Sequence, residues 1–196
     1  LTALYGLLEI AQDSTDLDEI QMLLARSQAS ARRMNDEIEN WLTHAVARDG
    51  ELQLQPLDLA PIIEELQHTY PSAKIEDKLT LKPLGDAVLI RQVVFNLVSN
   101  AVNYAPKGES PDIVVATAAD LEPSMVRIEV RDQGTPLPPS EWVRIFEPYS
   151  RGAGAGLQAS GTGMGLATCK RIVERHGGHI SVTPNRDSEG VPIGNT

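Results

Sequence analysis

The sequence of 196 residues predicts an α+β fold in two parts, a helical hairpin followed by a two-layer α/β sandwich. Apolar or small residues recur every three or four positions from Leu17 to Ala45, which is the spacing of a heptad seam on one long helix. That pattern ends at Gly50. Alternating segments and amphipathic segments then follow one another, as in a sheet covered by helices.

The composition is that of a globular protein, with 41% hydrophobic and 22% charged residues. The net charge of −10 argues against binding to nucleic acid or to an anionic membrane surface. No apolar run approaches the ~20 residues that span a bilayer. The single cysteine, Cys169, excludes an internal disulfide and fits a reducing compartment. We therefore expect a cytoplasmic segment without membrane contact.

The first predicted domain, residues 1–49, is an antiparallel helical hairpin. A shorter helix over 1–11 has the same spacing as the longer one, and "QDSTDLD" supplies turn and N-cap residues between them. One hairpin leaves part of its seam exposed, so we expect a homodimer through residues 1–47 that forms a four-helix bundle. The alternative is that the hairpin packs on its own chain. The seam of the longer helix comprises Leu17, Ile20, Leu24, Ser27, Ala31, Met34, Ile38, Trp41 and Ala45.

The second predicted domain, residues 50–196, contains both strands and helices. Asp58 is placed to cap a helix in whose first turn Pro61 is tolerated. Gly177 and Gly178 are placed to end the last helix. The expected elements are a short strand after Gly50, a helix over 58–70, strands near 74–75 and 80–82, a helix over 86–104, strands over 113–117 and 126–130, a helix over 162–175 and a strand over 179–183.

Three amides occur on the long helix predicted over 86–104. Asn96, Asn100 and Asn103 are four and three residues apart, so they share one face of that helix. Asparagine is a poor helix former because its side chain competes for backbone hydrogen bonds. The row indicates either a binding site or a polar face whose hydrogen bonds are satisfied, and this segment alone leaves both open.

Three later segments have features of a site. "VRIEVRDQGTP" ends a strand with Asp132 and turns at Gly134, and "IFEPYSRG" begins an irregular segment. "RGAGAGLQASGTGMGLA" holds six glycines before a helix, where free backbone N–H groups favour an anion. Each segment alone is weak evidence, because flexible glycine-rich loops often bind nothing and an acid at a strand end is usually solvated.

In this order, "NLVSNAVNY", "DQG", "IFEPYSRG", "GTGMGLA" and "HGG" resemble the N, G1, F and G2 boxes of sensor histidine kinases, over roughly residues 86–183. Those kinases share an ATP-binding superfamily with gyrase B, the heat-shock ninety chaperones and MutL. The resemblance implies a sandwich of the Bergerat ATP-binding type. It extends to "LTALYGLLEIAQ" and to 17–47, which are similar to the two dimerisation helices of such kinases.

The resemblance implies roles for single residues in binding ATP and Mg²⁺. Asn100 would coordinate Mg²⁺ through its carbonyl oxygen, with Asn96 supporting the metal and phosphates. Asp132 would accept a hydrogen bond from the adenine amino group, Gly134 would let the base approach the backbone, and Tyr104 would lie against the base. A lid over 147–160 and a phosphate cradle would complete the site, with Arg151, Gly161, Thr162, Gly163, Gly165 and Leu166.

Two positions depart from the family pattern. Asn103 occupies a position where many members have lysine, which removes a phosphate-facing cation, although the amide is still expected at the nucleotide. Pro136 replaces the second glycine of the first glycine box. Proline fixes φ and removes an N–H, so we expect an altered lid hinge and weaker nucleotide binding.

None of the four histidines is followed by the Glu/Asp-x-Arg/Asn-x-Pro context of a phosphoacceptor. We expect structural or solvated roles for His44, His68, His176 and His179. The acceptor histidine is expected a few residues before Leu1, so no catalytic residue is assigned within this chain.

The resemblance implies the core of a two-component sensor histidine kinase, which transfers the γ-phosphoryl group of ATP to a histidine and then to an aspartate of a response-regulator receiver domain. A non-catalytic, dimeric nucleotide-binding or signalling module is the alternative, favoured by Pro136. An ATPase clamp of the gyrase or MutL type fits less well. Those clamps use a glutamate as a base at the position of Asn96, and an amide cannot act as that base.

Overall fold

A computed structural model describes residues 16, 19–27, 30, 51–106, 108–120, 122, 125–150, 163–186 and 191–196. The chain divides into two compact units, Leu1–Leu42 and Thr43–Thr196. Each unit is described by itself.

In the first unit, residues 19–27 form a helix. Leu23 and Ser27 are buried, whereas Leu24 is 44% exposed. Leu23, which the expected seam does not include, therefore faces another side of this helix from Leu24, because successive helix positions point about 100° apart. The place of Leu24 in a seam between two chains stays a prediction. The shorter helix over 1–11, Leu17 and the seam residues beyond residue 30 lie outside the described residues.

The second unit contains a central three-stranded sheet in the order β2-β4-β5. Strand β2 (Lys74–Leu79) pairs in parallel with β4 (Asp112–Ala119), and β4 pairs antiparallel with β5 (Val126–Arg131). Two antiparallel ribbons accompany this sheet. One joins β1 (Leu54–Pro56) to β3 (Leu84–Asp86), and the other joins β6 (Pro184–Arg186) to β7 (Pro192–Asn195).

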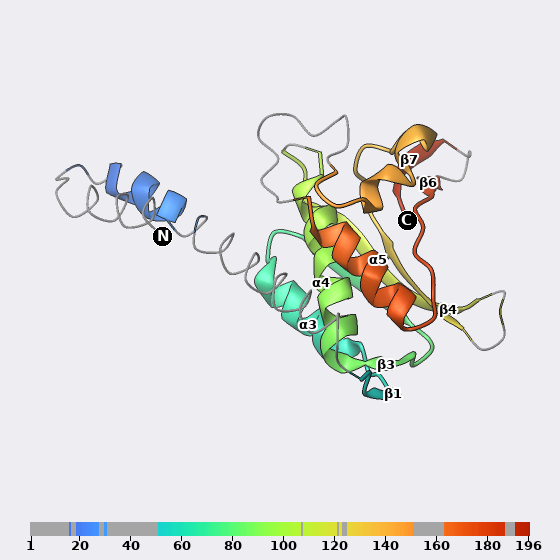
Figure 1. The fold of residues 1–196 in the computed structure, drawn as a ribbon. Coiled ribbons are helices and arrows are strands. Elements are labelled where there is room, and N and C mark those ends of the chain that lie inside the picture. The colour runs from blue at the N-terminus through green and yellow to red at the C-terminus, as the bar shows by residue number, and fades with distance from the viewer. Residues whose placement is uncertain are drawn as a thin grey trace. The chain divides into compact units, whose positions relative to one another are not determined.

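Helices form the second layer. Figure 1 shows α3 (Ala60–Thr69), α4 (Ala87–Asn103) and α5 (Gly165–Arg175) together on one side of the strands. Two short 3₁₀ turns, η1 (Pro139–Glu141) and η2 (Arg144–Phe146), lie between β5 and α5 in the sequence. The fold class predicted from the sequence is confirmed.

The main core lies between this helical layer and the sheet. Aliphatic side chains from α3, α4 and the strands fill it, because each amphipathic element turns its apolar face inward. Its buried members are Leu57, Leu59, Ile63, Leu66, Ile75, Ile90, Val94, Val98, Ala101, Ile113 and Val115. A smaller cluster joins α4 to α5 through Leu89, Val93, Cys169 and Ile172.

Two predicted strands are wrong. Residues 80–82 form no strand, because the Thr117 hydroxyl accepts hydrogen bonds from the Thr80 and Leu81 N–H groups and bends the chain after β2. Residues 179–183 form no strand either, and β6 begins at Pro184. Strand β7, which includes most of the final "PIGNT", gives the ribbon its partner and therefore decides where it begins.

The helix boundaries shift by a few residues from those expected. α5 begins at Gly165 rather than near residue 162, and α3 begins at Ala60, whose N–H donates to the Asp58 carboxylate at 3.2 Å. Asp86 caps α4 by accepting from the N–H groups of Val88 and Leu89. Within the described part of the chain, no helix has the length and apolar character needed to cross a membrane.

Candidate functional site

The amide row of α4 begins where that helix meets the start of α5. The side chain of Asn96 accepts from Gln92 Nε2 at 3.2 Å and donates to the Gly165 carbonyl at 3.5 Å. A Cβ atom placed on Gly165 would lie 3.7 Å from Asn96 Cγ. Asn96 therefore faces the first turn of α5, as the expected phosphate side of the site requires.

The next two amides continue along α4 toward its C-terminal end. Asn100 is partly buried one turn beyond Asn96. Asn103 is exposed, and its Nδ2 lies 3.4 Å from Ser99 Oγ on the same helix. Tyr104, the residue after the helix, is 51% exposed. The row is thus solvent-accessible at its far end.

His176 joins the C-terminal end of α5 to the N-terminal end of α4. Its Nε2 accepts from the Asp86 N–H at 3.0 Å, and its Nδ1 lies 2.8 Å from the Ile172 carbonyl. A carbonyl only accepts and an amide N–H only donates, so these bonds require a neutral ring protonated on Nδ1. The C-terminal end of α5 is thereby held at the N-terminal end of α4, and the helices run antiparallel.

Between these ends, Cys169 packs against α4, with its Sγ 3.8 Å from the Val93 carbonyl. Burial raises the pKa of its thiol to about 12. This thiol is therefore protonated at neutral pH, and it acts as a core residue rather than as a nucleophile.

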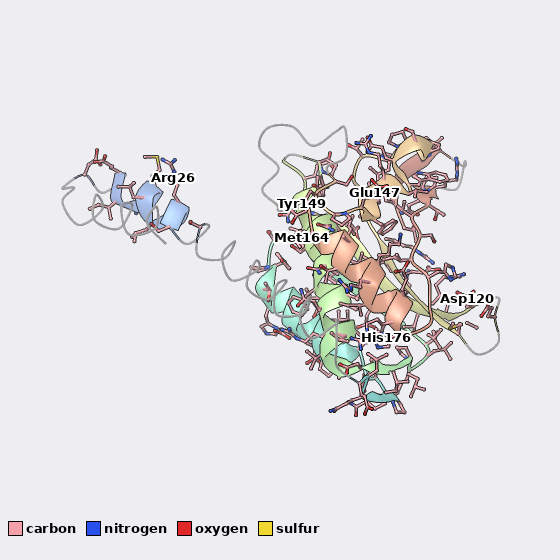
Figure 2. All side chains as sticks on the ribbon, viewed as in Figure 1. Arg26, Asp120, Glu147, Tyr149, Met164 and His176 are labelled. Atoms are coloured by element: carbon pink, nitrogen blue, oxygen red, sulfur yellow. The ribbon has the colours of Figure 1, made fainter. Side chains whose placement is uncertain are left out.

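The segments before and after residues 151–162 meet beside the start of α5. The Tyr149 N–H donates to the Gly163 carbonyl at 2.9 Å. Gly163 has φ +69°, and a Cβ atom on it would lie 3.0 Å from backbone atoms of Tyr149. Glycine is therefore required at this position. Figure 2 shows Tyr149 and Met164 near one end of α5 and His176 at the other.

Three residues implied at the phosphates, Arg151, Gly161 and Thr162, lie outside the described residues, as does most of the expected lid. Of the cradle, the structure describes Gly163, Gly165 and Leu166, and it brings Gly165 against the amide row.

The second half of the site is the turn after β5. The Asp132 carboxylate oxygen Oδ1 accepts from the Gly134 N–H at 2.8 Å and from the Asn195 N–H at 3.0 Å. Burial raises the pKa of Asp132, while these donors act in the opposite direction. A Cβ atom on Gly134 would lie 3.1 Å from the Tyr104 carbonyl oxygen, so the turn packs against the end of α4.

The structure therefore brings two groups of predicted residues to α4. Asn96 lies against Gly165 at one point of the helix, and the Asp132–Gly134 turn lies against Tyr104 at its end. Asn100 is between them in the sequence of the helix. A site of this kind can hold an elongated ligand with an anionic end at the α5 N-terminus and a hydrogen-bonding end at Asp132.

Sequence reasoning missed Asn195, and although it expected a structural or solvated role for His176, it did not identify the partner of that residue. Asn195 bonds to Asp132 from 63 positions away, and His176 bonds to Asp86 from 90 positions away. No local pattern marks either residue. Gly194 precedes Asn195 in the sequence, but it indicates close packing only once β7 is known to lie beside Asp132.

Comparison with known proteins identifies the fold and the family. The family model described as "Histidine kinase-, DNA gyrase B-, and HSP90-like ATPase" matches residues 85–193. Among solved structures, the mycobacterial sensor histidine kinase MprB has a TM-score of 0.60 and 25% identity, over 72% of this chain and 92% of that one. Full-length ShkA in complex with AMPPNP has a TM-score of 0.66 and 23% identity, over 99% of this chain and 42% of that one, and it shows likeness of fold.

Curated relatives give the same result. Two-component system protein A of Emericella nidulans is 38% identical over 121 residues, which are 60% of this chain and 18% of that protein. Sensor histidine kinase RcsC of Escherichia coli K12 is 28% identical over 198 residues, which are 92% of this chain and 20% of that protein. The chain thus spans about a fifth of the length of these relatives. The chain belongs to the family of histidine kinase-, DNA gyrase B- and HSP90-like ATPases, and within it this is the ATP-binding catalytic core of a histidine kinase.

Proposed function

We propose that this chain is the core of a two-component sensor kinase that binds Mg-ATP along α4 and transfers the γ-phosphoryl group to a histidine, from which it passes to a response-regulator aspartate. The observation that carries the proposal is the double contact of α4. The start of α5 lies at Asn96, and the Asp132–Gly134 turn lies at Tyr104.

The α5 N-terminus supports the phosphate end of this site. Its N-cap residue Met164 makes no side-chain capping bond, and its first turn contains no acidic residue. Among the described residues, no side chain caps the first N–H groups of this helix, so these groups would bind a phosphate, and the helix dipole favours negative charge there. A Cβ atom on Gly165 would make an ordinary van der Waals contact with Asn96 at 3.7 Å, so this turn lies directly beside the amide.

The turn after β5 supports the adenine end. Asp132 has an oxygen atom, Oδ2, for which the described residues provide no recorded hydrogen bond, and this atom would accept from the adenine amino group. Tyr104 is exposed beside that turn, where its ring would cover the base. Gly134 leaves room for the base to approach the backbone.

Asn100 and Asn96 have the donor atoms that Mg²⁺ requires when the ligand itself brings negative charge. Neutral amide oxygens suit a magnesium ion that keeps waters and binds phosphates. Asn100 would be the main protein ligand, and Asn96, held by Gln92 and the Gly165 carbonyl, would support it. The ion would neutralise phosphate charge.

Residues 1–49 would form the dimerisation hairpin, and residues 50–196 would form the ATP-binding domain. The two curated relatives are named as a two-component system protein and a sensor histidine kinase, which favours phosphotransfer to a receiver domain over an ATPase clamp. Asn96 also favours this choice, since an amide cannot serve as the base that activates water in such clamps. Pro136 is the feature that supports a non-catalytic module as a second candidate.

Titration calorimetry with ADP and MgCl₂ tests the binding part of the proposal. Asn100→Ala should weaken Mg-dependent binding at least 10-fold and leave the melting temperature nearly unchanged, because its side chain is not part of the core. Gln55→Ala removes an exposed amide from β1 and should bind as the wild type does. Equal ADP affinity in Asn100→Ala and the wild type would refute the role of Asn100.

Incubation with γ-labelled ATP tests the transfer part. The chain of 196 residues should bind nucleotide and form no acid-labile phosphohistidine, because none of its histidines has an acceptor context. A longer chain from the same gene that includes residues before Leu1 should become labelled. Nucleotide binding without label on the longer chain would favour the non-catalytic module, and steady phosphate release without label would favour the clamp.

A further inference from the structure

The side-chain amide of Asn195 spans the residue at which the chain departs from the family pattern. Asn195 Oδ1 accepts from the Leu137 N–H at 2.9 Å, and Asn195 Nδ2 donates to the Thr135 carbonyl at 3.1 Å. These two backbone groups flank Pro136 on either side. The Asn195 side chain, on β7, therefore hydrogen-bonds to the backbone on both sides of Pro136 and holds this turn in place.

The same residue also bonds to the carboxylate of Asp132. Its N–H and its Nδ2 lie 3.0 Å and 3.4 Å from Oδ1, which also accepts from the Gly134 N–H. A carboxylate oxygen has about two lone-pair directions, so Oδ1 has no capacity left for a ligand. Among the described residues, no bond is recorded to Oδ2, which remains the acceptor of this carboxylate.

Strand β7 packs tightly against the end of β5, which holds these hydrogen bonds in place. The Asp132 N–H donates to the Asn195 carbonyl at 2.9 Å, which joins β7 to the end of β5. A Cβ atom on Gly194 would collide with the Asp132 carbonyl, so only glycine lets β7 approach this far. On the other side of the turn, Trp142 Nε1 donates to the Leu137 carbonyl at 3.0 Å.

We propose that Asn195 is a specificity-determining positioning residue: it holds the Pro136 turn, occupies Oδ1 of Asp132 and so directs Oδ2 to select a base that carries an exocyclic amino group. The inference rests on the proposed nucleotide site. It also explains how this turn accommodates a proline where the family pattern has a glycine. Pro136 lacks an N–H, and the two backbone groups beside it are bonded to Asn195 instead of depending on a glycine conformation.

The test compares ADP with inosine diphosphate, which has an oxo group in place of the adenine amino group. Wild-type protein should prefer ADP. Asn195→Ala should weaken ADP binding about 10-fold, as expected for about 1.4 kcal/mol of lost hydrogen bonding, and change inosine diphosphate binding by less than about 2-fold. The preference for ADP should therefore fall. An unchanged preference in a folded Asn195→Ala protein would overturn the inference.

Asn185→Ala is the matched control. Asn185 lies on the paired strand β6, and its Nδ2 donates to the Asp132 backbone carbonyl at 3.2 Å rather than to the carboxylate. Its removal should affect both diphosphates equally. An equal fall in ADP preference for Asn185→Ala would show that only the stability of the ribbon matters, and would also overturn the inference.

Asn195→Asp provides a second variant if the alanine protein does not fold. It keeps an acceptor for the Leu137 N–H but loses the amide donor and brings a carboxylate to Oδ1 of Asp132. Protection of the Leu137 amide from hydrogen exchange should persist while ADP preference falls, and a retained preference would contradict the proposal. If wild-type protein binds neither diphosphate, the proposed function itself fails, which is a different result from a retained preference.

Discussion

Asp132 is subject to two opposing physical effects. Burial disfavours the charged carboxylate and raises its pKa, whereas the N–H groups of Gly134 and Asn195 favour the charged form. The net shift is upward. For an acid, a raised folded-state pKa means that the folded protein binds more protons than the unfolded chain between the two pKa values. Stability from this residue is therefore full below the unfolded pKa, about 3.9, and is lost as pH rises through the folded pKa.

Asp132→Asn should remove this pH dependence, because the amide does not titrate. Its free energy of unfolding relative to that of the wild type should rise as pH increases through the window just above about pH 4, and then become constant. Urea unfolding at several pH values measures the difference. Asp77→Asn, on the exposed side of β2, serves as the control. A pH-independent difference for Asp132→Asn would show that the carboxyl has no raised pKa.

The junction of α4 and α5 shows how elements far apart in the sequence position the site. His176 bonds the end of α5 to the start of α4, Cys169 packs at the middle, and Gly165 then meets Asn96. Because the helices are antiparallel, a fixed contact at the C-terminal end of α5 sets where its N-terminal end lies along α4. The phosphate end of the proposed site would therefore depend on a histidine remote from it.

His176→Ala should lower the free energy of unfolding by about 1–3 kcal/mol, since the Asp86 N–H loses its partner in a partly buried position. It should also weaken ADP binding by releasing the start of α5. Urea unfolding and calorimetry measure the two effects.

His68→Ala is a matched control. The His68 Nδ1 also lies close to the carbonyl four residues earlier, that of Glu64. Among the described residues, however, the His68 ring makes no hydrogen bond to another helix or strand. It should leave stability within about 0.5 kcal/mol of the wild type. Equal losses for the two variants would show that the bond between the helices contributes nothing.

The two units of the chain differ in how their apolar side chains are exposed to solvent, in the parts that the structure describes. The second unit encloses its own core between helices and sheet. In the helix over 19–27, Met22 and Leu24 are 54% and 44% exposed while Leu23 is buried. Apolar surface thus remains on the helix of the first unit, which favours the homodimer predicted through residues 1–47.

Light scattering should give the mass of a dimer for the chain of 196 residues and that of a monomer for a chain beginning at Glu51. Leu24→Glu should shift the equilibrium toward monomer at micromolar concentration, because a charge would replace apolar surface in the bundle. Gln21→Glu, an exposed position on the same helix, should remain dimeric. A monomeric wild type at high micromolar concentration would contradict the prediction.

The sequence by itself determined the order and type of most elements. The 3.6-residue pattern located α4, and the alternation of apolar residues located β4 and β5, because these signals depend on neighbours along the chain. The family motifs also pointed to Asn96, Asp132 and the glycine-rich segment before α5 as site residues, since each motif is a short segment, and their roles stay predictions. The strands expected at 80–82 and 179–183 were wrong because a side-chain bond from Thr117 and the pairing with β7 come from distant residues.

Only the tertiary structure decided how these segments act together. It showed that Asn195 hydrogen-bonds to the backbone on both sides of Pro136 and to the Asp132 carboxylate. From the sequence, Pro136 was expected only to alter the lid hinge and weaken nucleotide binding. The tertiary structure also selected Leu23 over Leu24 for burial and made His176 the joint between two helices. The physical reason is the same in each case. A hydrogen bond or a buried contact depends on distance in space, and the residues that make it carry no local pattern that shows which distant partner they will meet.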